Sequence, residues 1–194
     1  KTEPTAMHIQ FQPITPQHSH FEPMSRLYQA SFPPDERRPV SQLRQIAQSE
    51  SRFSILGIAI PQAEAHGSPQ FAGFIAYWHF GTFIYVEHLA TQPQLRSQGL
   101  GKTLVEHLQS MFRGLPIVLE VEPAVDHVTT RRIAFYQRLG FRLHTRFRYM
   151  QPAYSPATQP LPLRLMTCRL TPRCHITLRQ MAQTIAREVY QNYY

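Results

Sequence analysis

The sequence predicts a mixed α/β domain in which a central, mostly antiparallel sheet of about six to seven strands is flanked by helices. Three consecutive strand-like segments occur in the first half of the chain, and helical and strand-like segments alternate in the second half. The chain has 194 residues, of which 42% are apolar, so it can bury the core of one domain. This composition argues against a disordered chain.

Two helices and a meander of three strands are predicted in the first half. Residues 24–30 form a short helix that ends before Pro33, and residues 40–49 carry apolar positions at helical spacing. The strands are residues 53–60, 71–80 and 83–91, joined by a polar hairpin loop at 61–69 and a turn at 81–82.

The second half alternates between helices and strands. The apolar residues of 100–111 lie on one stripe of a helix, which Gly114 ends. A helix at 130–139 stops at Gly140, a residue that suits the position after a helix end. The remaining predicted elements are strands at 117–122, 141–150 and 163–170 and a final helix at 176–190.

The chain is basic, with a formal net charge of +8 and only two lysines, Lys1 and Lys102. This charge suggests an anionic partner, which is a nucleic acid, a membrane surface or a phosphorylated cofactor. The arginines form no single run and do not interleave with aromatic residues, so a nucleic-acid-binding module is disfavoured. No apolar run reaches the roughly 18–20 residues of a membrane helix, and the N-terminus lacks a signal-peptide pattern.

The cysteines and histidines predict no metal site. Cys168 and Cys174 match no zinc or redox motif, and they are typical of thiols in a reducing compartment. The histidines show no metal-ligand spacing. We therefore expect a cytoplasmic protein without a membrane partner or a bound metal.

A strand followed by a glycine-containing loop and a helix is the most informative local pattern. Glu-His-Leu-Ala-Thr at 87–91 is followed by Arg-Ser-Gln-Gly-Leu-Gly-Lys at 96–102. Glycines let a ligand approach the backbone closely, and the first amides of a helix have no internal acceptor. The loop can therefore bind phosphate oxygens, although its glycine spacing matches neither a P-loop nor a dinucleotide fingerprint. Alone, the same pattern is equally typical of a tight turn.

A second pattern follows the next predicted strand. Residues 131–141 place Tyr136 near the end of a helix, which Gly140 stops before Phe141 begins a strand. Taken alone, Tyr136 is a core residue of an amphipathic helix.

The two patterns together resemble the GNAT superfamily of N-acetyltransferases. Arg-x-x-Gly-x-Gly after a strand, then Phe-Tyr-x-x-x-Gly-Phe after the following strand, is specific when both occur in this order. The resemblance covers residues 7–170, and segments 31–38 and 85–90 are similar to a bacterial branch without a well-defined substrate. It implies the GNAT acyltransferase fold for that region.

The domain organisation follows from the same resemblance. The acyltransferase domain at 7–170 is followed by a C-terminal helix within 171–194. We interpret residues 1–6 as a remnant of expression that precedes a native start at Met7.

The resemblance implies an acetyl-coenzyme A-dependent N-acetyltransferase. It transfers an acetyl group to a primary amine of a small molecule or protein, by direct attack in a ternary complex. The alternatives are a coenzyme A-binding sensor without turnover and a basic nucleic-acid-binding protein on the same scaffold, whose affinity falls steeply with salt. A homodimer through Tyr190, Tyr193 and Tyr194 is a further expectation, and the alternative is that the final helix packs on its own sheet.

The cofactor residues implied by the resemblance lie on the strand and loop of the first pattern. The pantetheine arm bonds the main chain of Leu89, Ala90 and Thr91. The pyrophosphate lies on Arg96, Ser97, Gln98, Gly99, Leu100, Gly101, Lys102 and Thr103. Thr129 departs from the family, because many members place there an asparagine that contacts coenzyme A; a threonine offers a weaker hydrogen bond or none.

Tyr136 and a carboxylate are the implied catalytic residues. The Tyr136 hydroxyl protonates the departing thiolate as a general acid. Because an amine needs a base, Glu87 is the first candidate: strand alternation places it on the face of Leu89 and opposite His88. Apolar neighbours are expected to raise the pKa of Glu87. The second candidates are Glu120 and Glu122, and the alternative for all three carboxylates is a salt bridge with an arginine.

The acceptor pocket implied by the resemblance is formed by segments 32–40 and 151–161. A cationic amine would favour Asp35, Glu36, Glu120 or Glu122, whereas an acidic or phosphorylated substrate would favour Arg37 or Arg38. The sequence does not decide between these substrate classes.

Overall fold

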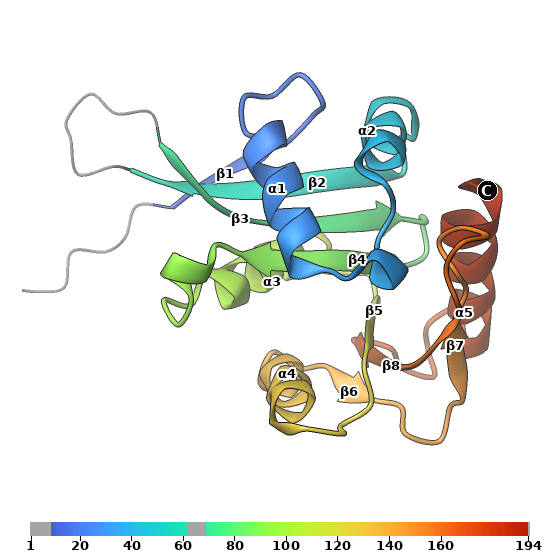
Figure 1. The fold of residues 1–194 in the computed structure, drawn as a ribbon. Coiled ribbons are helices and arrows are strands. Elements are labelled where there is room, and N and C mark those ends of the chain that lie inside the picture. Colours follow the sequence, from blue (N-terminus) through green and yellow to red (C-terminus); the bar gives the residue numbers. More distant parts are fainter. Residues whose placement is uncertain (1–8, 62–68, 194) are drawn as a thin grey trace, which may run out of the picture.

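The computed structural model describes residues 9–61 and 69–193, and it confirms the mixed α/β fold (Figure 1). Within this part, the strands form an eight-stranded sheet in the order β1-β2-β3-β4-β5-β8-β6, with β7 paired to β8. The pairing of β4 with β5 is parallel, and the other recorded pairings are antiparallel. The strands are β1 (Gln10–Pro13), β2 (Phe53–Ile60), β3 (Gln70–His79), β4 (Ile84–Thr91), β5 (Ile117–Val121), β6 (Arg142–Leu143), β7 (Tyr149–Gln151) and β8 (Leu161–Cys168).

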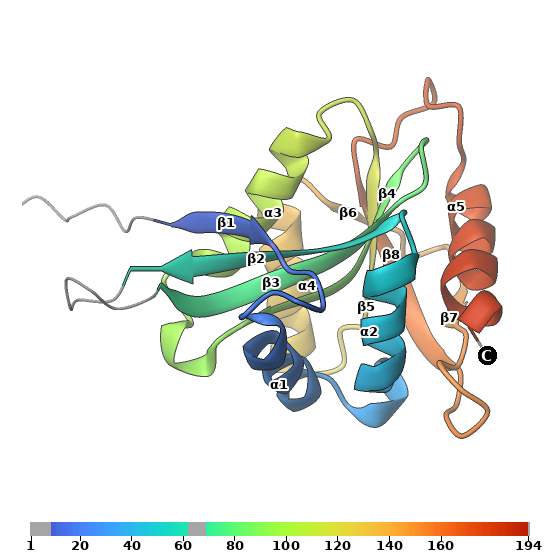
Figure 2. The same ribbon diagram turned by 90° about the horizontal axis from the view of Figure 1, so that it is seen from above.

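Helices cover both faces of the sheet. They are α1 (Phe21–Ser31), α2 (Val40–Ser49), α3 (Leu100–Met111), α4 (His127–Arg138) and α5 (Leu178–Ile185). Figure 2 shows α1 and α2 on one side of the sheet and α3 on the other. One core cluster joins α1, α2 and α5, and a second joins α3 and α4. The strands contribute to both clusters because their side chains alternate between the two faces.

The sequence predicts α2 and β2 with their observed bounds, but it does not predict β1. This strand is short, contains Pro13 and pairs only with β2 at the sheet edge, where proline is tolerated. Most of the predicted hairpin loop at 61–69, together with Met7 and residues 1–6, lies outside the described residues.

The single strand predicted at 141–150 is wrong, because this segment forms two short strands, β6 and β7. Both pair with β8, Leu143 opposite Met166 and Tyr149 opposite Leu163. The chain therefore advances six residues while its partner advances three, and the excess residues form a turn.

The final helix changes its winding near the C-terminus. The sequence predicts one helix at 176–190, whereas α5 is α-helical only to Ile185 and continues as a π-helical turn, Ala186–Tyr190. Tyr190 is buried within its own chain, so the expectation that it is exposed for a partner is wrong. The side chains of Tyr193 and Tyr194 lie outside the described residues, and the homodimer stays a prediction.

A β-bulge interrupts the pairing of β3 with β4. Val86 lies opposite Tyr77 and His88 lies opposite Ala76, so Glu87 is an extra residue without a partner on β3. A bulge of this kind bends its strand and changes the direction of the side chains that follow.

Because of the bulge, the side chains of β4 do not lie on the faces that simple alternation predicts. The His88 ring packs against Tyr28 of α1, with ring centroids 4.9 Å apart, so His88 lies on the same side as Glu87 rather than opposite it. Leu89 instead packs with the cluster of α3 and α4. Simple alternation fails here because one residue has been inserted.

Candidate active site

A cleft of about 260 Å³ opens where β4 and β5 separate. The two parallel strands pair only from Ile84 to Val86 and from Ile117 to Leu119. The cleft brings together many of the predicted site residues. Those that line it are Glu36, Glu87, Leu89, Ala90, Thr91, Arg96, Glu120, Glu122 and Tyr136.

The first turn of α3 leaves backbone amides without an acceptor within the helix. Gly99 precedes the helix with φ of 79° and provides no side-chain cap. The first helical hydrogen bond runs from Thr103 N to Gly99 O, at 2.9 Å. The amides at positions 100–102 therefore have no acceptor within the helix, and they can bind phosphate oxygens. Lys102 adds positive charge beside them, although it also lies 3.8 Å from Glu106.

The bulge exposes main chain to the cleft. The Glu87 side chain is only 1% exposed, whereas the residue as a whole is half-buried. The exposed atoms of Glu87 therefore belong mainly to its backbone. This is the type of surface that an amide-containing ligand can bind by strand-like hydrogen bonds.

The Glu87 carboxylate is fully engaged inside the protein. Arg38 Nε donates to it at 3.1 Å, Trp78 Nε1 at 2.6 Å and the Tyr154 hydroxyl at 3.1 Å. Burial acts to raise the pKa of Glu87, but Arg38 and these hydrogen bonds outweigh it, so that the pKa is lowered. The predicted raised pKa is wrong, and the arginine salt bridge that was the alternative reading is present.

Arg38 is also unsuited to the substrate role considered for it. Arg38 is only 1% exposed, and its Nη2 donates a hydrogen bond to the carbonyl of Val189 at 2.5 Å. Its guanidinium is therefore a structural group that links Glu87 to the C-terminal turn.

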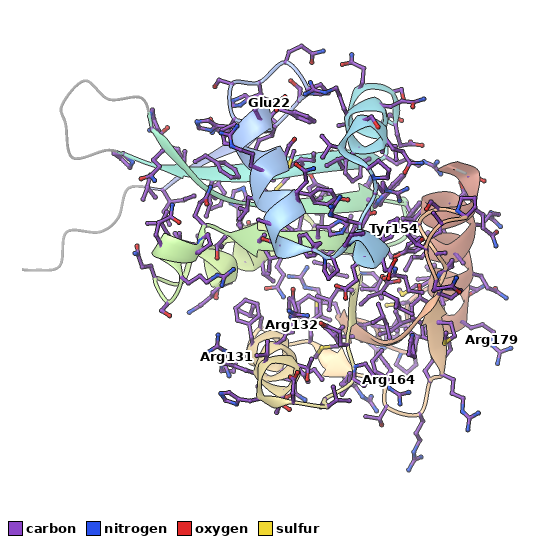
Figure 3. All side chains as sticks on the ribbon, viewed as in Figure 1. Glu22, Arg131, Arg132, Tyr154, Arg164 and Arg179 are labelled. Atoms are coloured by element: carbon purple, nitrogen blue, oxygen red, sulfur yellow. The ribbon has the colours of Figure 1, made fainter. Side chains whose placement is uncertain are left out.

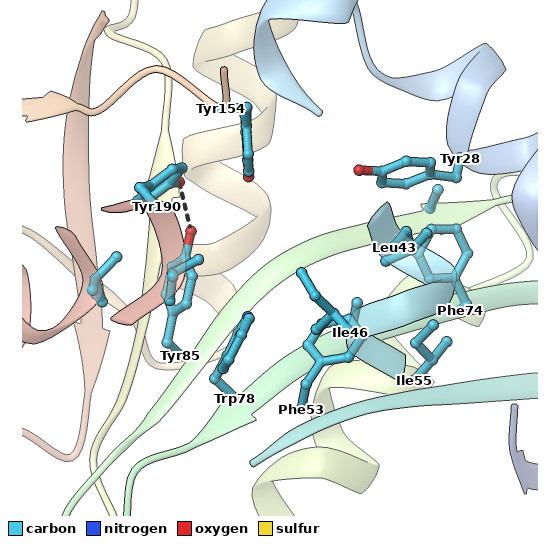
Figure 4. Close-up of a cluster of buried hydrophobic side chains, with 14 of the residues drawn as sticks. Tyr28, Leu43, Ile46, Phe53, Ile55, Phe74, Trp78, Tyr85, Tyr154 and Tyr190 are labelled. Atoms are coloured by element: carbon cyan, nitrogen blue, oxygen red, sulfur yellow. Dashed lines mark hydrogen bonds between the residues drawn. The ribbon is translucent and has the colours of Figure 1, made fainter. Parts of the chain in front are cut away.

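Glu120 of β5 has a different environment. Its carboxylate accepts hydrogen bonds from the hydroxyls of Tyr85 and Tyr190, each at 2.8 Å, and from that of Tyr149. Figure 4 shows the hydroxyls of Tyr85 and Tyr190 within hydrogen-bond distance of each other. Burial raises the pKa of Glu120 to about 7, although the three tyrosines act to lower it; the nearby Glu87 adds to the rise. Glu120 thus has the property that was predicted for Glu87.

Two further carboxylates, Glu36 and Glu122, line the cleft. Glu122 forms an ion pair with Arg132, which Figure 3 shows on the side of α4 that faces β4. Burial and the charge of Glu122 raise the pKa of Glu36. Asp35 is exposed and Arg37 donates to the carbonyl of Phe32; neither is among the cleft residues.

Tyr136 projects from α4 into the cleft wall. Its ring packs edge-to-face against Phe135 and Phe141, with centroids 5.0 Å and 5.6 Å away. Burial raises the pKa of Tyr136 to about 12, with Arg132 opposing and Glu122 reinforcing the shift. The hydroxyl of Tyr136 is therefore protonated at neutral pH.

Thr129 does not point to a cofactor role, because its hydroxyl caps α4. It accepts hydrogen bonds from the amides of Val125 and Asp126, at 3.1 Å each, and donates to the Asp126 carboxylate at 2.8 Å. The same carboxylate accepts from the Thr129 amide, which completes a capping box.

The described residues contain no group of three or more histidine, cysteine, aspartate or glutamate side chains that could hold a metal ion. In the same part of the chain, no helix has the length and apolar character needed to cross a membrane.

The cluster of three tyrosines around Glu120 has no counterpart among the sequence predictions. They come from β4, β7 and the C-terminal turn, which the fold brings together from distant positions. Tyr85 alone had a local signal, because it lies on the same strand as Glu87.

Comparison with known proteins gives a consistent result. Residues 63–143 match the model of a family described as "Acetyltransferase (GNAT) domain". A Bacteroides thetaiotaomicron structure, assigned to the GNAT acetyltransferase family, is 37% identical with a TM-score of 0.80. The match covers 93% of this chain and 98% of that one.

Two other relatives are more distant. The Bacillus subtilis protein YjbC, assigned as an acetyltransferase, is 39% identical over 70 residues, which is 35% of this chain and 35% of that protein. Arabidopsis thaliana NAA60, solved with acetyl-CoA, is 17% identical over 82% of this chain and 97% of its own, with a TM-score of 0.63. At this identity, the likeness to NAA60 concerns the fold alone.

The buried Glu87–Arg38 pair predicts a strong effect on folding. We expect Glu87→Gln to lower the free energy of unfolding by about 3–5 kcal/mol at neutral pH, because Arg38 is left as a buried charge without its partner. Glu22→Gln is the matched control: Glu22 pairs with Arg44 at the surface, and its loss should cost at most about 1 kcal/mol. Urea unfolding measures both, and equal losses would contradict a structural role for Glu87.

The same pair predicts a pH dependence. Because the folded pKa of Glu87 is lowered, its contribution is present above the ordinary value of 4.5 and is lost as pH falls through the folded value. The difference in unfolding free energy between wild type and Glu87→Gln should therefore shrink in acid.

Proposed function

Because this chain belongs to the GNAT acetyltransferase family, we propose that it is an acetyl-coenzyme A-dependent N-acetyltransferase acting on a primary amine. The amine, of a small molecule or a protein, attacks directly in a ternary complex. One observation carries the proposal: Glu120, whose pKa is raised to about 7, and the protonated hydroxyl of Tyr136 line the same cleft.

The residues around the cleft fit coenzyme A. The amides at the uncapped N-terminus of α3 would hold the pyrophosphate, and Gly99 leaves space for it. The main chain of residues 87–91, which line the cleft, would bond the pantetheine amides. Acetyl-coenzyme A supplies the acetyl group as a thioester.

We propose Glu120 rather than Glu87 as the general base. A carboxylate with a pKa of about 7 is partly ionised at neutral pH and has the proton affinity that base catalysis needs. Glu87, in contrast, is held in its ionised form by the ion pair with Arg38. Glu120 accepts a proton from the amine, directly or through one water molecule, as the new N–C bond forms.

Tyr136 is the proposed general acid. Its hydroxyl donates a proton to the sulfur as the C–S bond breaks, so that coenzyme A leaves as a neutral thiol. The step is balanced: the amine proton goes to Glu120 and the sulfur proton comes from Tyr136.

The charges of the cleft favour a cationic acceptor. Burial and, after it, the charge of Glu122 raise the pKa of Glu36, although Arg132, which pairs with Glu122, opposes the rise. A protonated amine entering this region would relieve the repulsion.

The cofactor site is tested at Gly99. Valine there would be strained at φ of 79° and would add a side chain to the phosphate cradle. We expect Gly99→Val to weaken acetyl-coenzyme A binding at least about tenfold by calorimetry. Gly81→Val is the matched control, since Gly81 has φ of 76° in the turn between β3 and β4. An unchanged affinity for Gly99→Val would remove the loop from the cofactor site.

The base is tested by the pH dependence of kcat/KM, measured from thiol release with the most active amine of a library. The wild type should show an ascending limb near the Glu120 pKa of about 7. Glu120→Gln should lose this limb and lower the rate by roughly 10²–10⁴-fold. Glu122→Gln should keep the limb, and a wild-type profile from Glu120→Gln would show that another group is the base.

The acid is tested with Tyr136→Phe, which keeps the ring packing and removes the hydroxyl. We expect kcat to fall roughly 10–100-fold while acetyl-coenzyme A affinity stays near that of wild type, because a thiolate is a fair leaving group. A wild-type kcat with folded protein would exclude Tyr136 as the acid.

A further inference from the structure

The end of the chain reaches the candidate active site through Tyr190. Its hydroxyl lies 2.8 Å from Glu120 Oε2 and 3.1 Å from the Tyr85 hydroxyl (Figure 4). Tyr190 is 1% exposed, so these contacts are shielded from solvent. The contact joins residues that are 70 positions apart in the sequence.

The π-helical turn Ala186–Tyr190 keeps Tyr190 on the buried side of its helix. Ile185 and Tyr190 are both buried and are five residues apart. On an α-helix, a side chain five positions on points about 140° away. A π-turn closes over five residues, and the Gln191 amide accordingly bonds the carbonyl of Ala186. The irregular winding therefore directs Tyr190 inward.

Arg38 fastens this turn to the bulge of β4. Its Nη2 donates to the carbonyl of Val189, the residue before Tyr190, while its Nε donates to Glu87. The Tyr154 ring packs on Tyr190 with centroids 4.8 Å apart, and its hydroxyl also donates to Glu87. The position of Tyr190 is thus fixed from two sides.

We infer that Tyr190 is a positioning residue of the reaction, which orients the Glu120 carboxylate and stabilises its ionised form from the C-terminal turn. The inference rests on the proposed function, in which Glu120 is the base. A phenol donates a hydrogen bond to an ionised carboxylate and so stabilises the ionised form relative to the protonated one. The other titratable groups near Glu120 are Tyr85 and Glu87 of β4, Tyr149 of β7 and Tyr154 of the loop after β7, and Arg38 compensates the charge of Glu87.

The test measures the protonation of Glu120 without using activity. Protein carrying carboxyl-¹³C glutamate is titrated by NMR, and Glu120→Gln identifies the Glu120 signal. Tyr190→Phe, which removes only the hydroxyl, should move the Glu120 midpoint upward by about one pKa unit, the size of one hydrogen bond to a charged group. Tyr154→Phe is the matched control, because Tyr154 packs on the same ring but donates to Glu87. In Tyr154→Phe, the titration midpoint of Glu120 should stay at its wild-type value.

An unmoved midpoint in Tyr190→Phe, with near-ultraviolet circular dichroism showing retained packing, would overturn the inference. Tyr85→Phe, which removes a second donor to the same oxygen, calibrates the size of the shift. The pH–rate profile then separates the two proposals. A limb that moves with the midpoint supports both, whereas a moved midpoint with an unmoved limb supports the Tyr190 contact and rejects Glu120 as the base.

Discussion

One buried ion pair, between Arg38 and Glu87, holds together the segments that surround the cleft. Both side chains are about 1% exposed, and burying two charges costs more free energy than their attraction returns unless further hydrogen bonds satisfy them. Trp78, Tyr154 and the carbonyl of Val189 supply those bonds. Through this network, the segment before α2 contacts the bulge of β4, the loop after β7 and the C-terminal turn. The cleft therefore has a wall fixed by electrostatics rather than by apolar packing alone.

Two carboxylates on neighbouring strands differ in chemistry because they differ in partners. Glu87 faces a cation, which lowers its pKa, whereas Glu120 faces neutral phenols, whose hydrogen bonds do not outweigh burial. Enzymes commonly separate the roles of two acidic groups in this way. The negative charge of Glu87 also contributes to the rise of the Glu120 pKa, so the ion-paired carboxylate influences the protonation of its neighbour.

The sequence predicted those features that depend on local chemistry. Helix spacing and glycine positions identified α3, its N-terminal loop at Gly99 and the place of Tyr136 on α4. The short strands β1, β6 and β7 depend on pairing with β2 and β8 rather than on their own pattern, so β1 was missed and the other two were merged. The predicted rise of the Glu87 pKa is wrong because strand alternation shows neither the bulge at Glu87 nor its partner Arg38. The Tyr190 contact with Glu120 likewise depends on distant segments.

The scarcity of lysine has a consequence for an enzyme that handles a reactive thioester beside amines. Such a protein risks acylating its own side chains, which would erase their charge. Among the 20 lysine and arginine residues, only Lys1 and Lys102 are lysines. The guanidinium groups stay protonated at neutral pH and are therefore poor nucleophiles. On the proposed function, the positive surface resists self-modification, and Lys102 at the start of α3 is the one side-chain amine in the described residues that remains open to it.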